Sequence, residues 1–139
     1  MKKAKFWVLL LLTAVIFSGC VYAANTEKPL LRVVTKIHVS YENGPIRTQQ
    51  TFTQEEKIDK ILNYLRGIRP YGKPEQDPET VQGSLYRIIL YHSDGYQKHY
   101  LQKSDRFMKI EDGKWEKIDS GKAKALGNLL GRMESDVNG

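Results

Sequence analysis

Cysteine is almost absent from this 139-residue sequence, in which Cys20 is the only one. A single thiol cannot form an intramolecular disulfide, so we expect the hydrophobic core to hold the fold together. The length is typical of one domain. A domain of this size can bury a workable core without disulfides or a structural metal.

Motifs that specify a reaction are also missing. The sequence has no Gly-x-Ser-x-Gly nucleophile turn and no glycine-rich phosphate loop. His92 and His99 are predicted to share one sheet face at about 7 to 8 Å, but no cysteine or close carboxylate completes a metal site. The acidic residues Glu75, Asp77 and Glu79 lack the glycine and terminal glutamate of a calcium loop. We therefore expect no enzymatic activity, no cofactor and no bound metal.

The excess of positive charge is modest. The sequence has 22 basic and 16 acidic side chains, which give a formal net charge of +6. Lys2, Lys3 and Lys5 belong to a predicted leader, and without them 19 basic residues remain, a net charge of +3. This balance falls short of the strongly basic surface of nucleic-acid-binding proteins, so no nucleic-acid partner is expected.

The first 20 residues have the layout of an export signal. The leader lysines precede an apolar run from Phe6 to Phe17, and the small residues Ser18 and Gly19 lead to Cys20. The stretch Phe17-Ser18-Gly19-Cys20 resembles the lipobox of bacterial lipoproteins, with Phe17 where that family prefers leucine. The resemblance implies that residues 1–19 are a cleaved signal peptide. It also implies that Cys20 receives the lipid that anchors the protein to the membrane.

Two other interpretations of the leader stay open. Val21-Tyr22-Ala23 is a small-x-small site, so a signal peptidase could cut before Ala24 and discard Cys20. The 19 uncharged residues from Phe6 to Ala24 could instead remain as a membrane helix. All three interpretations place residues 25–139 outside the cytoplasm.

Residues 20–30 are predicted to be a short tether, residues 31–134 a single α+β domain, and residues 135–139 a frayed C-terminus. Alternating apolar and polar residues and Asn-Gly or Asp-Gly turns indicate hairpins, while apolar residues at helical spacing indicate helices. Thr53 and Glu56 fit a capping box for the first helix. Helices packed on one face of an antiparallel sheet, in the order β-β-α-β-β-β-β-α, are the predicted architecture. The elements expected are strands at 31–41, 46–52, 85–92, 96–101, 106–110 and 114–118, and helices at 54–66 and about 120–133.

The best candidate for a binding surface comes from the predicted hairpin at residues 85–101. If Asp94-Gly95 is a two-residue turn, one face of the hairpin carries three tyrosines and two cations, a combination favoured at protein interfaces. The same residues also fit an exposed sheet face stabilised by cross-strand pairs. This predicted face also includes Ile89, and its five candidate binding residues are Arg87, Tyr91, Tyr96, Lys98 and Tyr100.

Two aromatic residues outside that hairpin are further candidates. Tyr71 lies in the segment 68–83, which contains three prolines and two glycines and is predicted to be a long loop of the kind that often carries function. Trp115 is expected to anchor the last strand in the core or to offer a stacking platform for a sugar or peptide.

These features predict a non-enzymatic, membrane-anchored binding module of the bacterial cell envelope. Its predicted partners are the membrane, through the lipid on Cys20, and an unidentified extracytoplasmic protein. A sheet backed by helices resembles small exported inhibitor or PepSY-type domains in architecture. The alternatives are a binder of an anionic or sugar polymer that uses Arg87, Lys98 and Trp115, and a freely secreted inhibitor-like protein.

Overall fold

The structure is a computed structural model that describes residues 33–135. In this part of the chain, a six-stranded antiparallel sheet has the order β2-β1-β3-β4-β5-β6. The predicted signal peptide, the lipidation of Cys20, the tether and residues 136–139 lie outside the described residues. The elements are β1 (Val34–Asn43), β2 (Ile46–Phe52), α2 (Glu55–Gly67), η1 (Pro78–Thr80), β3 (Leu85–His92), β4 (Gln97–Lys103), β5 (Phe107–Ile110), β6 (Glu116–Lys117), α3 (Ser120–Ala123) and α4 (Ala125–Ser135).

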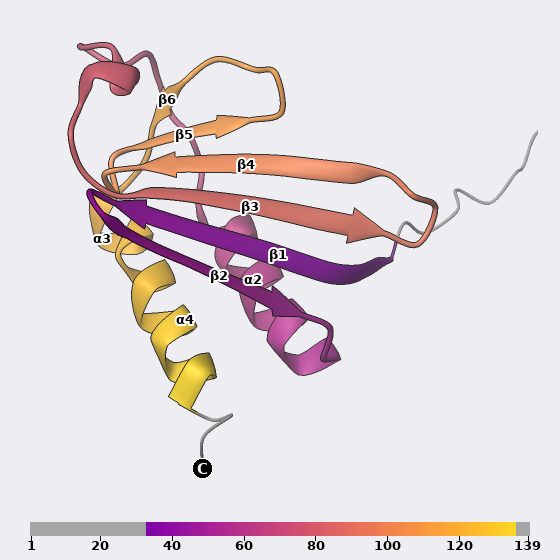
Figure 1. Cartoon of the computed structure of the whole chain (residues 1–139). Helices are drawn as coiled ribbons and strands as arrows, with labels where there is room; N and C mark the ends of the chain where they lie inside the picture. Colours follow the sequence, from indigo (N-terminus) through magenta and orange to yellow (C-terminus); the bar gives the residue numbers. More distant parts are fainter. Residues whose placement is uncertain (1–32, 136–139) are drawn as a thin grey trace, which may run out of the picture. The chain divides into compact units, whose positions relative to one another are not determined.

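The predicted α+β class and antiparallel sheet are confirmed. Figure 1 shows α2, in magenta, and α4, in yellow, on the same side of the sheet. The observed order of elements follows the prediction coarsely, with η1 added in the long loop and the last helix divided into α3 and α4. The division falls at Lys124. Asp119 is the N-cap of α3, and its side chain accepts a hydrogen bond from the backbone N–H of Lys122 at 2.9 Å.

Helix α2 begins one residue later than the predicted capping box requires. Its N-cap is Gln54, whose side chain makes no capping hydrogen bond, so the prediction that Thr53 caps the helix is wrong. The apolar stripe is confirmed, since Ile58, Ile61 and Leu65 are all buried against the sheet.

The main core lies between the sheet and the helices. Strand side chains alternate between the two sides, so every second residue of β1 and β3 points toward the helices. The central positions are completely or almost completely buried, and they include Ile37, Val39, Ile61, Ile88 and Leu126.

The segment between α2 and β3 covers the far end of the other side of the sheet. Its backbone pairs with β6, because Tyr71 N donates to Lys117 O at 3.0 Å and Lys117 N donates to Gly72 O at 2.8 Å. Phe107 points away from the helices, opposite Lys117 in the register, yet it is only 2% exposed. The long loop therefore shields a small apolar site of its own at the β5–β6 end.

A buried polar network ties three elements together beneath the sheet. Gln102 of β4 is fully buried, and its carboxamide oxygen accepts a hydrogen bond from the Tyr64 hydroxyl of α2. Its Nε2 donates to the carbonyl oxygen of Ala123 in α3 and to Asp105 Oδ1, each at 3.3 Å. Burial raises the pKa of Tyr64 well above its usual value.

Tyr86 is a second tyrosine under the sheet, and its environment predicts a loss of stability at high pH. Burial, helped by nearby Tyr41, raises the pKa of Tyr86 from 10.0 to about 12. Above pH 10 the unfolded state loses the phenolic proton before the folded state does, so stability should fall between about pH 10 and 12. Urea unfolding at pH 9 and pH 11 measures this fall, and it should be smaller in Tyr86→Phe. An equal fall in both proteins would contradict the assignment.

Candidate functional site

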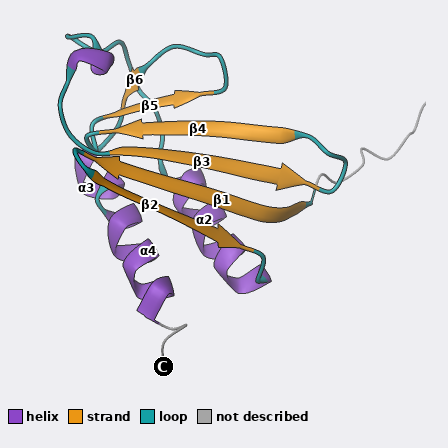
Figure 2. Cartoon of the chain, in the orientation of Figure 1, coloured by secondary structure: helices purple, strands orange, loops and turns teal. Residues whose placement is uncertain are grey.

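The two sides of the sheet have different surroundings. Among residues 33–135, α2, α3 and α4 pack on one side, and Figure 2 shows the short helix η1 and its loop toward the other side, near β6. We call the side of β1 to β5 that none of these helices covers the open face. Its residues are Lys36, His38, Ser40, Glu42, Arg47, Gln49, Thr51, Leu85, Arg87, Ile89, Tyr91, Gln97, His99, Leu101, Lys103 and Lys109.

The β3–β4 hairpin pairs one residue away from the predicted register. His92 N donates to Tyr96 O at 2.9 Å, and Gly95 N donates to His92 O at 3.0 Å. The connecting loop therefore holds three residues, 93–95, instead of two. Gly95 has a φ of 85°, the left-handed conformation that ends a three-residue hairpin loop.

This shift divides the predicted binding face. Arg87 and Tyr91 lie on the open face, whereas Tyr96, Lys98 and Tyr100 point toward the helix side. Tyr100 is only 9% exposed and belongs to the core. The prediction that these five residues share one face is therefore wrong.

Arg87 lies at the centre of the open face. It is exposed, and Ser40 and Leu101 flank it on the neighbouring strands. Leu85 and Ile89, two residues away on β3, leave part of their apolar side chains uncovered. This arrangement gives a guanidinium in an apolar setting on a rigid strand, which is a favourable position for binding an anionic group.

The open face is predominantly basic. In the part of the chain that the structure describes, none of its cations forms an ion pair. Lys36 Nζ instead lies 4.1 Å from the ring centroid of Tyr91, a cation–π contact that leaves the charge available at the surface. Five cations face a single carboxylate: Lys36, Arg47, Arg87, Lys103 and Lys109 against Glu42.

Four of these cations did not enter the predicted site: Lys36, Arg47, Lys103 and Lys109. They lie on the predicted strands or directly beside them, and their position in the period-two pattern could have indicated which side of the sheet they face. Combining them with Arg87 requires the strand order β2-β1-β3-β4-β5, which cannot be read from the sequence pattern.

The helix side of the β3–β4 hairpin forms a cleft of about 710 Å³ against α2. Lys98, Tyr100 and His92 line it, together with Asp59 and Arg66 of α2. Both ring nitrogens of His92 are buried and have no hydrogen-bond partner within the described residues. His99 lies on the open face, so the prediction that the two histidines share one side is wrong.

Trp115 lies beside the long loop and not in the main core, so its predicted role as a core anchor is wrong. It is half-buried, and its Nε1 donates to Glu79 Oε1 at 3.4 Å. With Pro74 and Pro78 it lines a pocket of about 670 Å³. Tyr71, 64% exposed, lies in the same loop with Lys117 Nζ 5.6 Å from its ring centroid.

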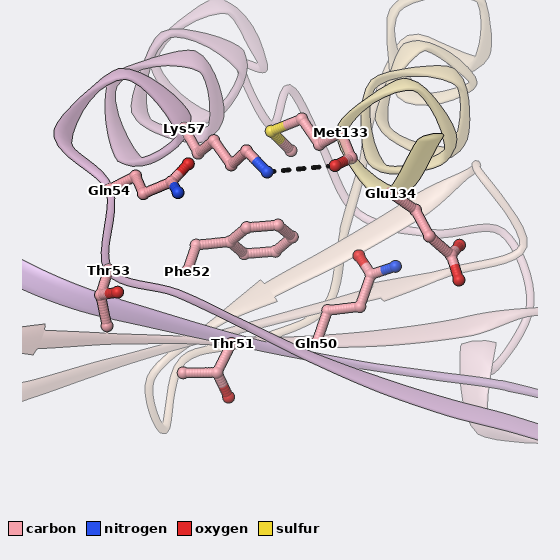
Figure 3. A pocket seen from close by; sticks show the side chains of 8 residues that line it. All are labelled: Gln50, Thr51, Phe52, Thr53, Gln54, Lys57, Met133 and Glu134. Atoms are coloured by element: carbon pink, nitrogen blue, oxygen red, sulfur yellow. Dashed lines mark hydrogen bonds between the residues drawn. The ribbon is translucent and has the colours of Figure 1, made fainter. Parts of the chain in front are cut away.

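A further pocket, of about 400 Å³, lies between the end of β2, the start of α2 and the end of α4. Figure 3 shows Phe52 at its centre and Lys57 reaching across to α4. Lys57 Nζ donates to the carbonyl oxygen of Met133 at 3.1 Å. A cation at a helix C-terminus is a stabilising contact, so Lys57 has a structural role here.

The described residues contain no group of three or more histidine, cysteine, aspartate or glutamate side chains that could hold a metal ion. Within residues 33–135, no helix is both long enough and apolar enough to cross a membrane. Among these sites, the open face carries the largest group of cations, and the apolar residues Leu85, Ile89 and Leu101 lie among them. Comparison with known proteins finds no family model, no curated protein and no solved structure that matches this chain.

Proposed function

We propose that this protein is a non-enzymatic binding module whose open face binds an acidic surface of another extracytoplasmic protein. The observation that supports this most is a set of five cations on the side of the sheet that carries none of the described α-helices, where none of the five forms an ion pair with another described residue. An array of one charge sign attracts a partner of the opposite sign and suppresses partners of the same sign.

The apolar residues among the cations favour a protein partner over a polymer. Leu85, Ile89, Leu101 and Tyr91 lie between the charged side chains and leave apolar area for a partner to bury. An anionic polymer could use the cations but would leave this area unused. The polymer site considered from the sequence also needs Lys98, which lies on the opposite side of the sheet from Arg87.

The proposed anchor is a lipid on Cys20, which would hold the module at the outer surface of the bacterial cell membrane. The intact mass of the mature protein from its native host tests this part separately. A mass that begins at Cys20 and includes acyl chains supports the lipoprotein. A mass that begins at Ala24 indicates the freely secreted alternative.

Charge reversal at the centre of the open face tests the binding function. We expect Arg87→Glu to weaken partner binding about tenfold or more, equivalent to about 1.4 kcal/mol, because a like charge would then face the acidic partner. In the native host, a photo-crosslinking residue at the exposed open-face position His99 should trap a discrete protein, and Arg87→Glu should reduce that adduct.

Two controls accompany this experiment. Lys124→Glu makes a charge reversal at an exposed position between α3 and α4 and should leave the adduct unchanged. The crosslinker at Asn63, exposed on α2, should trap much less of the partner. Equal trapping from His99 and Asn63 would show that the open face is not the binding surface. A polydisperse adduct that survives protease treatment would indicate that the partner is a polymer and not a protein.

A further inference from the structure

The two edges of the sheet differ in whether their outer backbone groups are paired. At the β6 edge, the backbone of Tyr71 and Gly72 already pairs with Lys117. At the other edge, β2 (Ile46–Phe52) pairs only with β1 among the described residues. A strand in this position offers unpaired backbone N–H and C=O groups to another strand.

Strand β2 lacks the features that usually protect an edge from pairing. Its seven residues, IRTQQTF, contain one charge, Arg47, and no proline. Its register with β1 is continuous from Ile37↔Phe52 to Asn43↔Ile46, so no bulge bends it away. Ile, Thr and Phe all favour extended strands. The edge is therefore competent to pair.

The direction of the free backbone groups follows from the register. Hydrogen-bonded and non-hydrogen-bonded pairs alternate along an antiparallel ladder. The two-residue turn of the β1–β2 hairpin closes on the pair Asn43↔Ile46, so the even-numbered residues of β2 direct their backbone groups toward β1. The backbone groups of Arg47, Gln49 and Thr51 consequently point outward.

We infer that β2 pairs antiparallel with β2 of a second copy of this chain, with the two-fold axis at Gln49. All three outward-pointing residues then find partners, because Gln49 pairs with its own copy and Arg47 pairs with Thr51 of the second copy. This register also separates the two Arg47 charges, so the single charge of the strand does not oppose itself.

Two side chains on the helix side of β2 support the same register. Ile46 is 56% exposed, and in the dimer it lies opposite Phe52 of the second copy and gains apolar cover. Gln50 Oε1 is buried and has no hydrogen-bond partner among residues 33–135. Figure 3 shows Gln50 rising from β2 toward α4. In the dimer, Gln50 lies opposite Thr48 of the second copy in a close non-hydrogen-bonded pair, so two polar side chains face each other there.

The pairing has a consequence for the open face. A two-fold axis perpendicular to the sheet keeps both open faces on the same side, so the two copies form one continuous basic surface. A partner with two acidic patches would then bind by avidity. The dimer itself does not depend on such a partner.

Co-purification of two differently tagged copies of the full chain, expressed together and extracted in detergent, tests the inference. Wild-type copies should co-purify. Gln49→Lys in both copies should abolish this, since two lysines then oppose each other at the axis. Gln49→Glu in both copies should do the same.

The decisive result comes from mixing the two variants. Gln49→Lys in one copy with Gln49→Glu in the other should restore co-purification, because position 49 faces itself only in the inferred register. Gln97→Lys, an exposed open-face change on β4, should leave co-purification intact. Failure of the wild-type copies to co-purify would overturn the inference. So would an unchanged signal in the Gln49→Lys pair, or no restoration in the mixed pair.

Discussion

Replacing Ile61 by alanine should lower the free energy of unfolding by about 3 to 4 kcal/mol, as expected for a large-to-small change in a well-packed core. Ile61 is 0% exposed and lies in the middle of α2, where the helix packs on the sheet. The substitution removes three carbon atoms and leaves a cavity that rigid strands cannot fill. Urea denaturation followed by circular dichroism measures the change, with the slope m expected to stay constant.

Two further variants test whether this loss of stability comes from the cavity in the core. Ile61→Val removes a single carbon atom and should cost only about 1 kcal/mol. Asn63→Ala changes an exposed position of the same helix and should stay within about 0.5 kcal/mol of the wild type. A loss below about 1 kcal/mol for Ile61→Ala would mean that α2 does not pack on the sheet as described.

The fold class could be predicted because its signals are local. The alternation of β1 and the apolar stripe of α2 are each visible in a dozen residues, and the bounds of β2 and β3 match the predicted ones. The start of α2 was predicted one residue early, because threonine is a common N-cap residue and the sequence does not show that Gln54 occupies that position instead. Local chemistry alone does not decide between two adjacent starts.

The candidate site was harder to predict because it depends on register. Ser93-Asp94-Gly95 can form a two-residue or a three-residue loop, and glycine supplies the positive φ in both. What separates the two is the tertiary environment: the observed loop directs Tyr100 and Gln102 toward the helices. Burying a glutamine costs free energy unless its side chain makes hydrogen bonds, and the partners of Gln102 lie outside β4.

Gln102 is buried in the observed register and hydrogen-bonded to other elements, so its replacement should be costly. We expect Gln102→Leu to lower the free energy of unfolding by about 2 to 3 kcal/mol, since the change leaves buried polar groups without partners. The carbonyl oxygen of Ala123 and the carboxylate of Asp105 both lose the donor that Gln102 Nε2 provides. The Tyr64 hydroxyl loses its acceptor and keeps only a long contact of 3.4 Å to Ala123 O.

A double-mutant cycle distinguishes this network from simple packing. Tyr64→Phe alone should also destabilise, because it leaves the carboxamide oxygen of Gln102 buried without a donor. The combination Tyr64→Phe with Gln102→Leu should cost clearly less than the sum of the two single changes, since both ends of the hydrogen bond are then removed together. Strictly additive losses would show that the two side chains contribute independently.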